Sequence, residues 1–190
     1  MKKLVTTTCL LAAACVAYRP TDTGTWMQPI TADDCPAGIP AAIVPAADQD
    51  LAFILDARGV QKYTCGAAGA WVFVAPDAEV YRGNQTFIYH YAGPTWEWLD
   101  GSTVVGARVS GATVDATAIP WLLLRAASHN AVEGKMTDIT SIQRVLTTGG
   151  LAPAGACTPG DAADVPYTAQ YIFYRTKSDH SANNIRCGAE

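Results

Sequence analysis

The residues of this chain best suited to contact a ligand lie in one short block, residues 90–100, with the sequence HYAGPTWEWLD. Four of them could line a cleft: His90, Trp96, Glu97 and Asp100. A tryptophan offers a flat apolar face to a sugar ring or another planar molecule, and carboxylates accept hydrogen bonds from hydroxyl groups. A structural interpretation stays open as well, with Trp96 as core filling and Asp100 as the first position of a tight turn.

A second pair of polar residues, Gln143 and Arg144, interrupts an apolar segment further along the chain. Neighbouring side chains of a β-strand point to opposite faces, so one of the two is expected to point inward. An inward arginine needs a partner, and a carboxylate could come from Glu97, Asp100 or Asp138. Gln143 and Arg144 are therefore candidates for ligand or anion binding, with a structural ion pair or a solvated arginine as the alternatives.

No spacing in the chain supports a catalytic centre or a metal site. Glu97 and Asp100 are offset across a predicted turn, which gives no support for the separation that the two carboxylates of a glycosidase need. The histidines show neither HxH nor HExxH spacing, so His90 and His129 could share a metal only through the fold. A Ser-His-Asp arrangement has no nucleophile-elbow context. We therefore assign no catalytic residue, no metal and no cofactor.

The first residues are typical of an exported protein. Lys2 and Lys3 precede an uncharged apolar stretch, residues 4–14, which ends in small residues directly before Cys15. This order is that of a secretory signal peptide. The cysteine after the small residues resembles the lipobox of bacterial lipoproteins and predicts lipidation at Cys15. Cleavage after Ala17 is the alternative.

Four cysteines lie beyond this signal region: Cys35, Cys65, Cys157 and Cys187. An even number of cysteines in a chain bound for an oxidising compartment predicts disulfides. Three pairings are open. We favour Cys65–Cys157 with Cys35–Cys187, because the second bond would join the two ends of the domain. No C-x-x-C spacing supports a zinc site.

Length and composition indicate a single globular domain behind the export signal. The chain has 190 residues, of which 49% are hydrophobic and 16% charged, and this suits one domain with a core. We expect a signal peptide over residues 1–14, a tether over 15–29 and one β-rich domain over 30–190. The net charge of -4, without a basic stripe, argues against a nucleic-acid partner. No later apolar run approaches the roughly 18 residues that span a bilayer, so a lipid anchor is the one membrane contact expected.

Strand signals dominate the predicted domain. Alternating apolar residues bounded by turn residues predict strands over 51–56 and 60–65 (joined by a turn at 57–59), 71–75 (stopped by Pro76), 86–91, 95–99, 102–109, 137–147 and 167–175. Residues 118–127 are apolar nearly throughout and fit a buried strand or a short helix. Evenly spaced strands without an amphipathic helix predict an all-β, mostly antiparallel fold, a single sandwich- or barrel-like domain with two disulfides.

Two details of this pattern concern the candidate site. Asp100-Gly101 between two strand-like runs is a strong hairpin signal, and both positions of such a turn need a positive φ. In residues 86–91, alternation places Ile88 and His90 on one face and the three aromatic residues on the other.

Six blocks of sequence occur in order between residues 60 and 174: VQKYTC (60–65), WVFVAPDAEV (71–80), HYAGPTWEWLDGSTVVG (90–106), AIPWLLLRAASH (118–129), ITSIQRVLTTGGLAPAGAC (139–157) and VPYTAQYIFY (165–174). In these blocks the chain resembles a family of exported bacterial and fungal proteins classed as a domain of unknown function. The resemblance implies export and no established activity, and both Cys65 and Cys157 fall within its blocks, which fits their pairing. Some fungal members are labelled malate dehydrogenase. This chain has no G-x-G-x-x-G between a strand and a helix, so we expect no dehydrogenase activity.

These features favour a non-enzymatic binding module of the cell envelope (outer membrane or periplasm) or the extracellular space. The expected partner is a small molecule, a glycan or an envelope protein. An extracellular hydrolase and a structural or assembly protein of the envelope stay open as alternatives. The candidate binding residues are His90, Trp96, Glu97, Asp100, Gln143 and Arg144.

Overall fold

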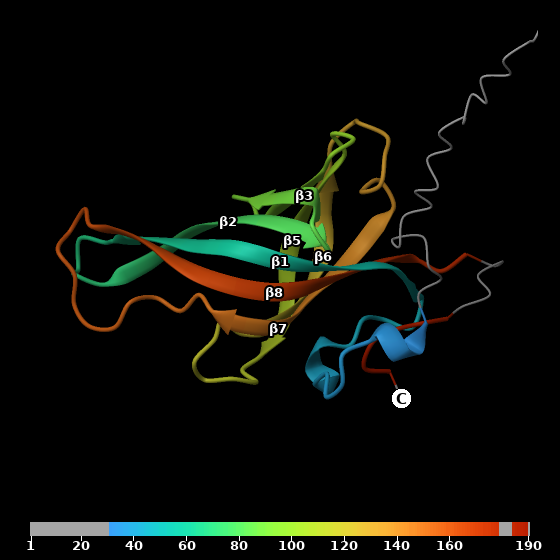
Figure 1. Ribbon diagram of the computed structural model, residues 1–190, viewed down its shortest axis with the longest axis horizontal. Coiled ribbons are helices and arrows are strands. Elements are labelled where there is room, and N and C mark those ends of the chain that lie inside the picture. Colours follow the sequence, from blue (N-terminus) through green and yellow to red (C-terminus); the bar gives the residue numbers. More distant parts are fainter. Residues whose placement is uncertain (1–30, 179–183, 190) are drawn as a thin grey trace, which may run out of the picture.

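The structure is a computed structural model that describes residues 31–178 and 184–189. The predicted signal peptide, the tether and the lipidation site Cys15 lie outside these residues. Eight strands follow one another along the chain: β1 (Gln49–Cys65), β2 (Trp71–Arg82), β3 (Gln85–Tyr91), β4 (Thr95–Trp98), β5 (Thr103–Ala112), β6 (Trp121–His129), β7 (Ile139–Gly149) and β8 (Ala162–Thr176). Each pairs antiparallel with the next, and β8 pairs with β1, so the sheet closes into a barrel (Figure 1).

The predicted all-β, mostly antiparallel, sandwich- or barrel-like domain is confirmed, and the closure of the sheet makes it a barrel. Closure depends on the long ladder between the first and last strands, which runs from Gln49 opposite Thr176 to Thr64 opposite Ala162. A closed barrel leaves no free sheet edge within the ring, and its inward side chains form a single interior. Residues 118–127, which fitted either a strand or a helix, contribute β6.

The predicted turn at residues 57–59 is wrong, because β1 runs through it without interruption. Gly59 serves a different purpose. A Cβ added there would lie 2.2 Å from the carbonyl oxygen of Asp77 and 2.5 Å from the Cα of Ala78. The glycine thus permits a close approach of β1 and β2 within the sheet.

The predicted end of a strand at Pro76 is also wrong, since β2 continues to Arg82. The ladder between β2 and β3 begins only at Ala78, opposite His90. Pro76 therefore has a neighbouring strand on one side alone, which is the setting in which a sheet tolerates a proline.

Local details near the 90–100 block follow the sequence in part. Asp100-Gly101 joins β4 to β5 as predicted, but only Gly101 has a positive φ, of 84°. The expectation of a positive φ at Asp100 is wrong. On β3, Ile88 and His90 are buried and Tyr89 is exposed, as alternation predicts, whereas Phe87 departs from the pattern and is buried.

Apolar side chains form two separate clusters, one inside the barrel and one outside it. The inner cluster includes Trp96, Tyr171, Phe173 and Ile88, which lie on three different strands. The outer cluster lies on the outer face of β1, β6, β7 and β8 and includes Trp121, Val145, Ile172 and Tyr174. It is covered by a strap, which we define as residues 31–48 and 184–189.

The strap consists of the segments that flank the barrel at both ends of the chain. Its first part contains the 3₁₀ turns η2 (Ala32–Asp34) and η3 (Ala41–Ile43). The Cys35–Cys187 disulfide ties its two parts together, so the predicted bond between the ends of the domain is confirmed. No helix in the described part of the chain is long and apolar enough to cross a membrane.

The second disulfide, Cys65–Cys157, is confirmed as well. It lies on a wing, defined as residues 60–65 of β1, 71–77 of β2 and 162–166 of β8. In the wing these three strands extend beyond the ladders with β3 and β7, and Figure 1 shows the extension on its left. The bond links the end of β1 to the loop that precedes β8.

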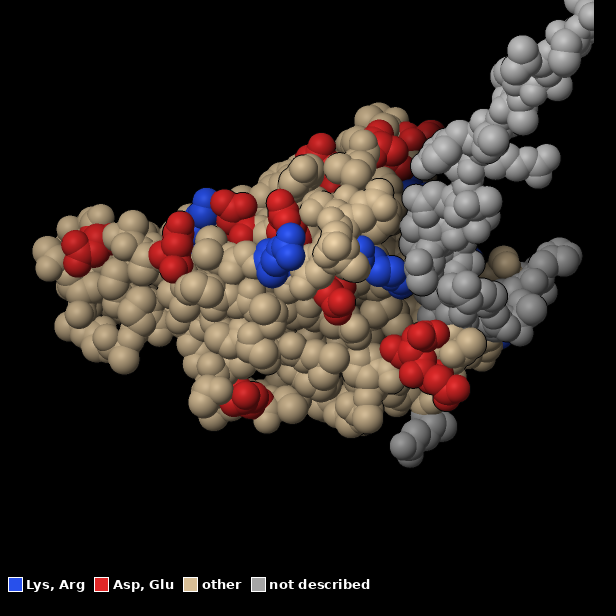
Figure 2. Space-filling model, in the orientation of Figure 1, with Lys and Arg blue, Asp and Glu red and all other residues tan. Residues whose placement is uncertain are grey.

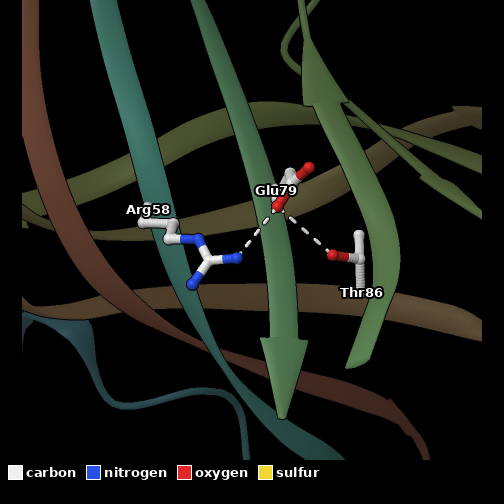
Figure 3. Close-up of polar contacts among 3 residues, drawn as sticks. All are labelled: Arg58, Glu79 and Thr86. Atoms are coloured by element: carbon white, nitrogen blue, oxygen red, sulfur yellow. Dashed lines mark hydrogen bonds and ion pairs between the residues drawn. The ribbon is translucent and has the colours of Figure 1, made fainter. Parts of the chain in front are cut away.

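The outer surface of the barrel carries a charged pair and a hydroxyl next to it. Arg58 on β1 pairs with Glu79 on β2 at 3.2 Å, and the Thr86 hydroxyl donates to the same carboxylate at 3.3 Å (Figure 3). On the face shown in Figure 2, charged side chains are scattered among uncharged ones, and the basic groups drawn there do not form a continuous stripe.

Candidate functional site: the barrel pocket

A cavity of about 570 Å³ opens between the barrel interior and the base of the wing. This volume lies within the range of small-molecule sites in proteins, about 300–1,000 Å³. Its lining residues come from all eight strands and their connections: Gln61, Tyr63, Phe73, Val74, Pro76, His90, Gly93, Pro94, Trp96, Arg108, Ile119, Pro120, Leu122, Leu124, Arg144 and Tyr171.

A β-bulge shapes the mouth of this pocket. Opposite Lys62 and Tyr63 of β1, the partners on β2 are Ala75 and Phe73, so Val74 is the extra residue. A bulge redirects the side chains around it. Phe73 and Val74 consequently both line the pocket although they are neighbours in a strand. Both are about half exposed, at 50% and 57%, so they lie at the entrance.

His90 is fully buried in the wall of the pocket. Its Nδ1 lies 2.8 Å from the carbonyl oxygen of Thr95. A carbonyl oxygen only accepts, so Nδ1 carries the ring proton and Nε2 is left as an acceptor. Burial lowers the pKa of His90 to about 3; the Thr95 hydrogen bond opposes this and the Arg144 cation adds to it. The ring is therefore neutral at ordinary pH.

Trp96 packs between the histidine and a tyrosine. Its ring stacks on His90 with centroids 4.2 Å apart and meets Tyr171 edge-on at 5.4 Å. The indole is 1% exposed, yet its Nε1 has no hydrogen-bond partner. Buried N–H groups are nearly always paired, so this donor lies unused in the wall of the pocket.

Arg144 brings a positive charge into the pocket. It lies on the inner face of β7, between Leu122 of β6 and Tyr171 of β8. Its Nε and Nη2 donate to the carbonyl oxygen of Pro120 at 3.3 and 2.8 Å. Burial raises the pKa of Tyr171, and the Arg144 cation opposes that rise. The same cation acts on His90, so its field reaches across the cavity.

Gln61 supplies a second unused donor from β1. Its side chain is 3% exposed, and Nε2 has no partner at hydrogen-bond distance. Burial raises the pKa of the neighbouring Tyr167 far above its ordinary value, and hydrogen bonding by the Gln61 side chain opposes this rise. The amide is thus directed toward the Tyr167 hydroxyl, although no partner lies within hydrogen-bond distance of its Nε2. The Tyr63 hydroxyl, by contrast, is satisfied, since it donates to the Gly150 carbonyl oxygen at 2.6 Å.

Three of the six residues proposed from the sequence thus meet in the pocket, namely His90, Trp96 and Arg144. Gln143, the neighbour of Arg144, points to the opposite side of β7. Its Nε2 donates to the Ile43 carbonyl oxygen at 2.7 Å, and its Oε1 accepts from the Tyr174 hydroxyl. It therefore holds the strap against the barrel.

The two acidic candidates also lie away from the pocket lining. Glu97 accepts a hydrogen bond from the Tyr91 hydroxyl at 2.8 Å on the outer side of the sheet. Asp100 organises the β4–β5 turn through Ser102 and the backbone N–H of Lys135. Burial opposes the effect, but these hydrogen bonds hold the pKa of Asp100 below its ordinary value. Neither carboxylate forms an ion pair with Arg144, as the sequence had suggested for an inward arginine; its partner is the Pro120 carbonyl.

Sequence reasoning missed Gln61, Tyr171 and the entrance residues Phe73 and Val74. The sequence did contain a signal for Gln61. Leu55, Ala57 and Gly59 precede it at alternate positions of the strand, so Gln61 is expected to share their inward face. For Tyr171, no feature of the sequence distinguishes its side chain from those of Tyr167 and Tyr174 on the same strand. The bulge at Val74 leaves no mark in the local pattern, so its second inward side chain could not be found.

The lining of the pocket combines N–H donors on Arg144, Trp96 and Gln61, an acceptor on His90 and an apolar wall, and the lining residues include no acidic one. Within the described part of the chain, no group of three or more His, Cys, Asp or Glu residues could hold a metal ion. Such a site can donate hydrogen bonds to the polar group of a ligand, while its apolar walls contact the rest of the molecule. Proton transfer near neutral pH has little support from these residues, since burial moves the pKa values of His90 and Tyr171 in opposite directions, away from neutrality.

A family model described as "Protein of unknown function (DUF3455)" matches residues 79–175, and the chain belongs to this family. The resemblance to a family of unknown function is therefore confirmed. The match includes His90, Trp96, Arg144 and Tyr171 and excludes Gln61 on β1. No curated protein and no solved structure matches the chain.

Proposed function

We propose that this DUF3455 protein is an exported, non-enzymatic binding protein that holds one small amphipathic molecule in the pocket of its barrel. The observation that carries the proposal is the cavity of about 570 Å³, walled largely by apolar side chains and lined by Trp96 and Gln61, whose buried N–H donors have no partner at hydrogen-bond distance. A folded protein rarely leaves such donors unpaired, because each costs about 1–3 kcal/mol. A bound molecule that accepts from them would recover this free energy.

The architecture supports the same function. Barrels of eight strands have interiors just wide enough to be filled by side chains or to hold one small ligand. Here the inner cluster fills one part of the interior, and the pocket occupies the part that adjoins the wing. The rigid sheet on all sides fixes the lining residues, which lowers the entropic cost of binding.

Export is supported by the two disulfides, because such bonds persist in oxidising compartments. A binding function is favoured over a hydrolase because the pocket lining holds no carboxylate and no serine or cysteine nucleophile. It is favoured over a purely structural role because a structural barrel has no use for an open cavity of about 570 Å³.

The experiment uses the full chain with both disulfides formed and the neutral fluorophore N-phenylnaphthylamine. We expect saturable binding to one site in the wild type. Val74→Trp places an indole ring at the pocket entrance and leaves the buried core unchanged. We expect it to weaken binding about 10-fold or more, the equivalent of about 1.4 kcal/mol.

Val72→Trp is the matched control. Val72 is the same residue type on the same strand and is 52% exposed, close to the 57% of Val74, but it does not line the pocket. It should bind the fluorophore like the wild type. Absence of saturable binding to the wild type, or equal weakening by the two substitutions, would refute the proposal.

A further inference from the structure

We infer that the molecule held in this pocket carries a carboxylate, and that its acidic group lies against Arg144. The inference rests on the proposed function and specifies the chemical class of its ligand. The class is an organic acid with one negative charge and an aromatic or aliphatic body. Its chemistry follows from the charges, donors and apolar surfaces of the pocket.

The first argument is an uncompensated charge. The two ion pairs between described residues are Arg58–Glu79 and Lys62–Asp77, both on the outer surface. Arg144 is half-buried and forms no ion pair with any carboxylate that the structure describes; its recorded partner is the Pro120 carbonyl. Charges withdrawn from water are normally paired in folded proteins. The missing partner is an anion that the described residues do not supply.

The second argument is the direction of the remaining hydrogen-bonding capacity. Trp96 Nε1 can only donate, and the unused atom of Gln61 is also a donor. Gln61, Trp96 and Arg144 line the same cavity from β1, β4 and β7, so three side chains that carry N–H donors share its wall. A carboxylate has two oxygens with about four acceptor sites and no proton to donate, so it matches such a set.

The third argument limits the charge and defines the body of the ligand. Two arginines line the pocket, of which Arg144 is half-buried and Arg108 is exposed. One inner charge and two neutral donors suit a monoanion better than a doubly charged phosphate. The other walls are apolar, including Phe73, Ile119 and Leu124, so the remainder of the molecule is an apolar body. Arg108 at the rim would attract the same charge during entry.

The test compares two probes of the same shape, naphthoic acid and naphthamide, by isothermal titration of the full chain. The acid is ionised at neutral pH and the amide is not. A hydrogen bond to a charged group contributes more binding free energy than a neutral one, and the difference changes affinity about 10- to 100-fold. We expect the wild type to bind the acid more tightly than the amide by that factor.

Substitutions then locate the preference. Arg144→Met keeps the unbranched stem of the side chain and removes its charged head, so both probes should bind with the same affinity. Arg144→Lys keeps the charge without the planar fork and should retain part of the preference. Arg125→Met removes an exposed arginine on the adjacent strand β6 and should leave the preference unchanged. If Arg144→Met does not fold, the comparison of the acid with the amide on the wild type still tests whether the pocket prefers a carboxylate.

The outcomes separate this inference from the proposed function. Equal binding of acid and amide by the wild type, together with saturable binding of N-phenylnaphthylamine, would overturn the carboxylate assignment and leave the binding function standing. A preference for the acid that survives in Arg144→Met would also overturn it. Failure of all three probes to bind would overturn both.

Discussion

Replacement of His90 by phenylalanine should change how the stability of this protein depends on pH. His90 lies inside the barrel, stacked on Trp96, with its Nδ1–H donated to the Thr95 carbonyl. The groups that face it are the indole of Trp96, the Tyr171 ring and the Arg144 cation. Phenylalanine preserves the ring and its stacking but can neither titrate nor donate.

The magnitude follows from the two protonation states. Burial lowers the pKa of His90 to about 3 in the folded protein, whereas an unfolded histidine has a pKa of about 6.5. As pH falls below about 6.5, His90 becomes protonated in the unfolded chain but stays neutral in the folded protein, so the free energy of unfolding decreases. Between about pH 7 and about pH 5 this single group should cost the wild type about 2 kcal/mol.

His90→Phe removes that dependence and also the hydrogen bond to Thr95, which is worth about 1 kcal/mol at every pH. The variant should therefore be less stable than the wild type by about 1 kcal/mol near pH 7. Near pH 5 the order should reverse, with the variant more stable by about 1 kcal/mol. Carboxylates elsewhere in the molecule affect both proteins equally, so the difference isolates His90.

The assay is urea denaturation at a series of pH values with the disulfides intact, followed by far-ultraviolet circular dichroism. Ile88→Val is the control, because Ile88 is buried on the same face of β3 and cannot titrate. Its cost of about 1 kcal/mol should not vary with pH. A difference between wild type and His90→Phe that stays constant from pH 7 to pH 5 would refute the assignment of a buried, neutral histidine.

Two further predictions concern the parts of the fold that hold the barrel in shape. Removal of the wing disulfide by Cys65→Ala with Cys157→Ala should lower the free energy of unfolding by up to about 4–5 kcal/mol in urea denaturation, because the bond joins residues 92 apart in the sequence. Gln143→Leu should lower it by about 2–4 kcal/mol, because the Tyr174 hydroxyl and the Ile43 carbonyl lose their buried partner; its affinity for naphthoic acid should stay that of the wild type.

Controls for these two changes are available in the same chain. Gln85→Leu replaces an exposed glutamine at the start of β3 and should alter stability by no more than about 0.5 kcal/mol. Loss of naphthoic acid affinity in Gln143→Leu at unchanged stability would place Gln143 in the binding site and contradict its role under the strap. A wing variant as stable as the wild type would show that the disulfide does not restrict the unfolded chain.

The class of the fold and the covalent links could be predicted from the sequence because their signals are local or countable. Period-two alternation and turn residues such as Gly101 fix strands within a few residues of chain. Four cysteines in a domain predicted to be exported leave three pairings, and the proximity of the two ends of a domain favours one of them. The errors at Gly59 and Pro76 have a common reason: a glycine or proline that ends an isolated strand can continue one whose neighbours accommodate it.

The site could be predicted only in part, because it is assembled across the barrel. The sequence selected His90, Trp96 and Arg144 by residue type, but it could not decide which of Gln143 and Arg144 points inward. That choice depends on the register between β6, β7 and β8, which places Arg144 opposite Leu122 and Tyr171.

Tertiary structure alone brings Gln61 of β1 to the same cavity as Trp96 and Arg144, since β1 meets β8 only when the sheet closes. It also determines that neither Glu97 nor Asp100 pairs with Arg144, because the outward position of Glu97 follows from pleating and the place of Asp100 from the turn it organises. Sequence thus determined the strands, the disulfides and the residue types available for binding. Closure of the sheet decided which of those residues share one interior, because contacts between distant strands depend on register and not on local pattern.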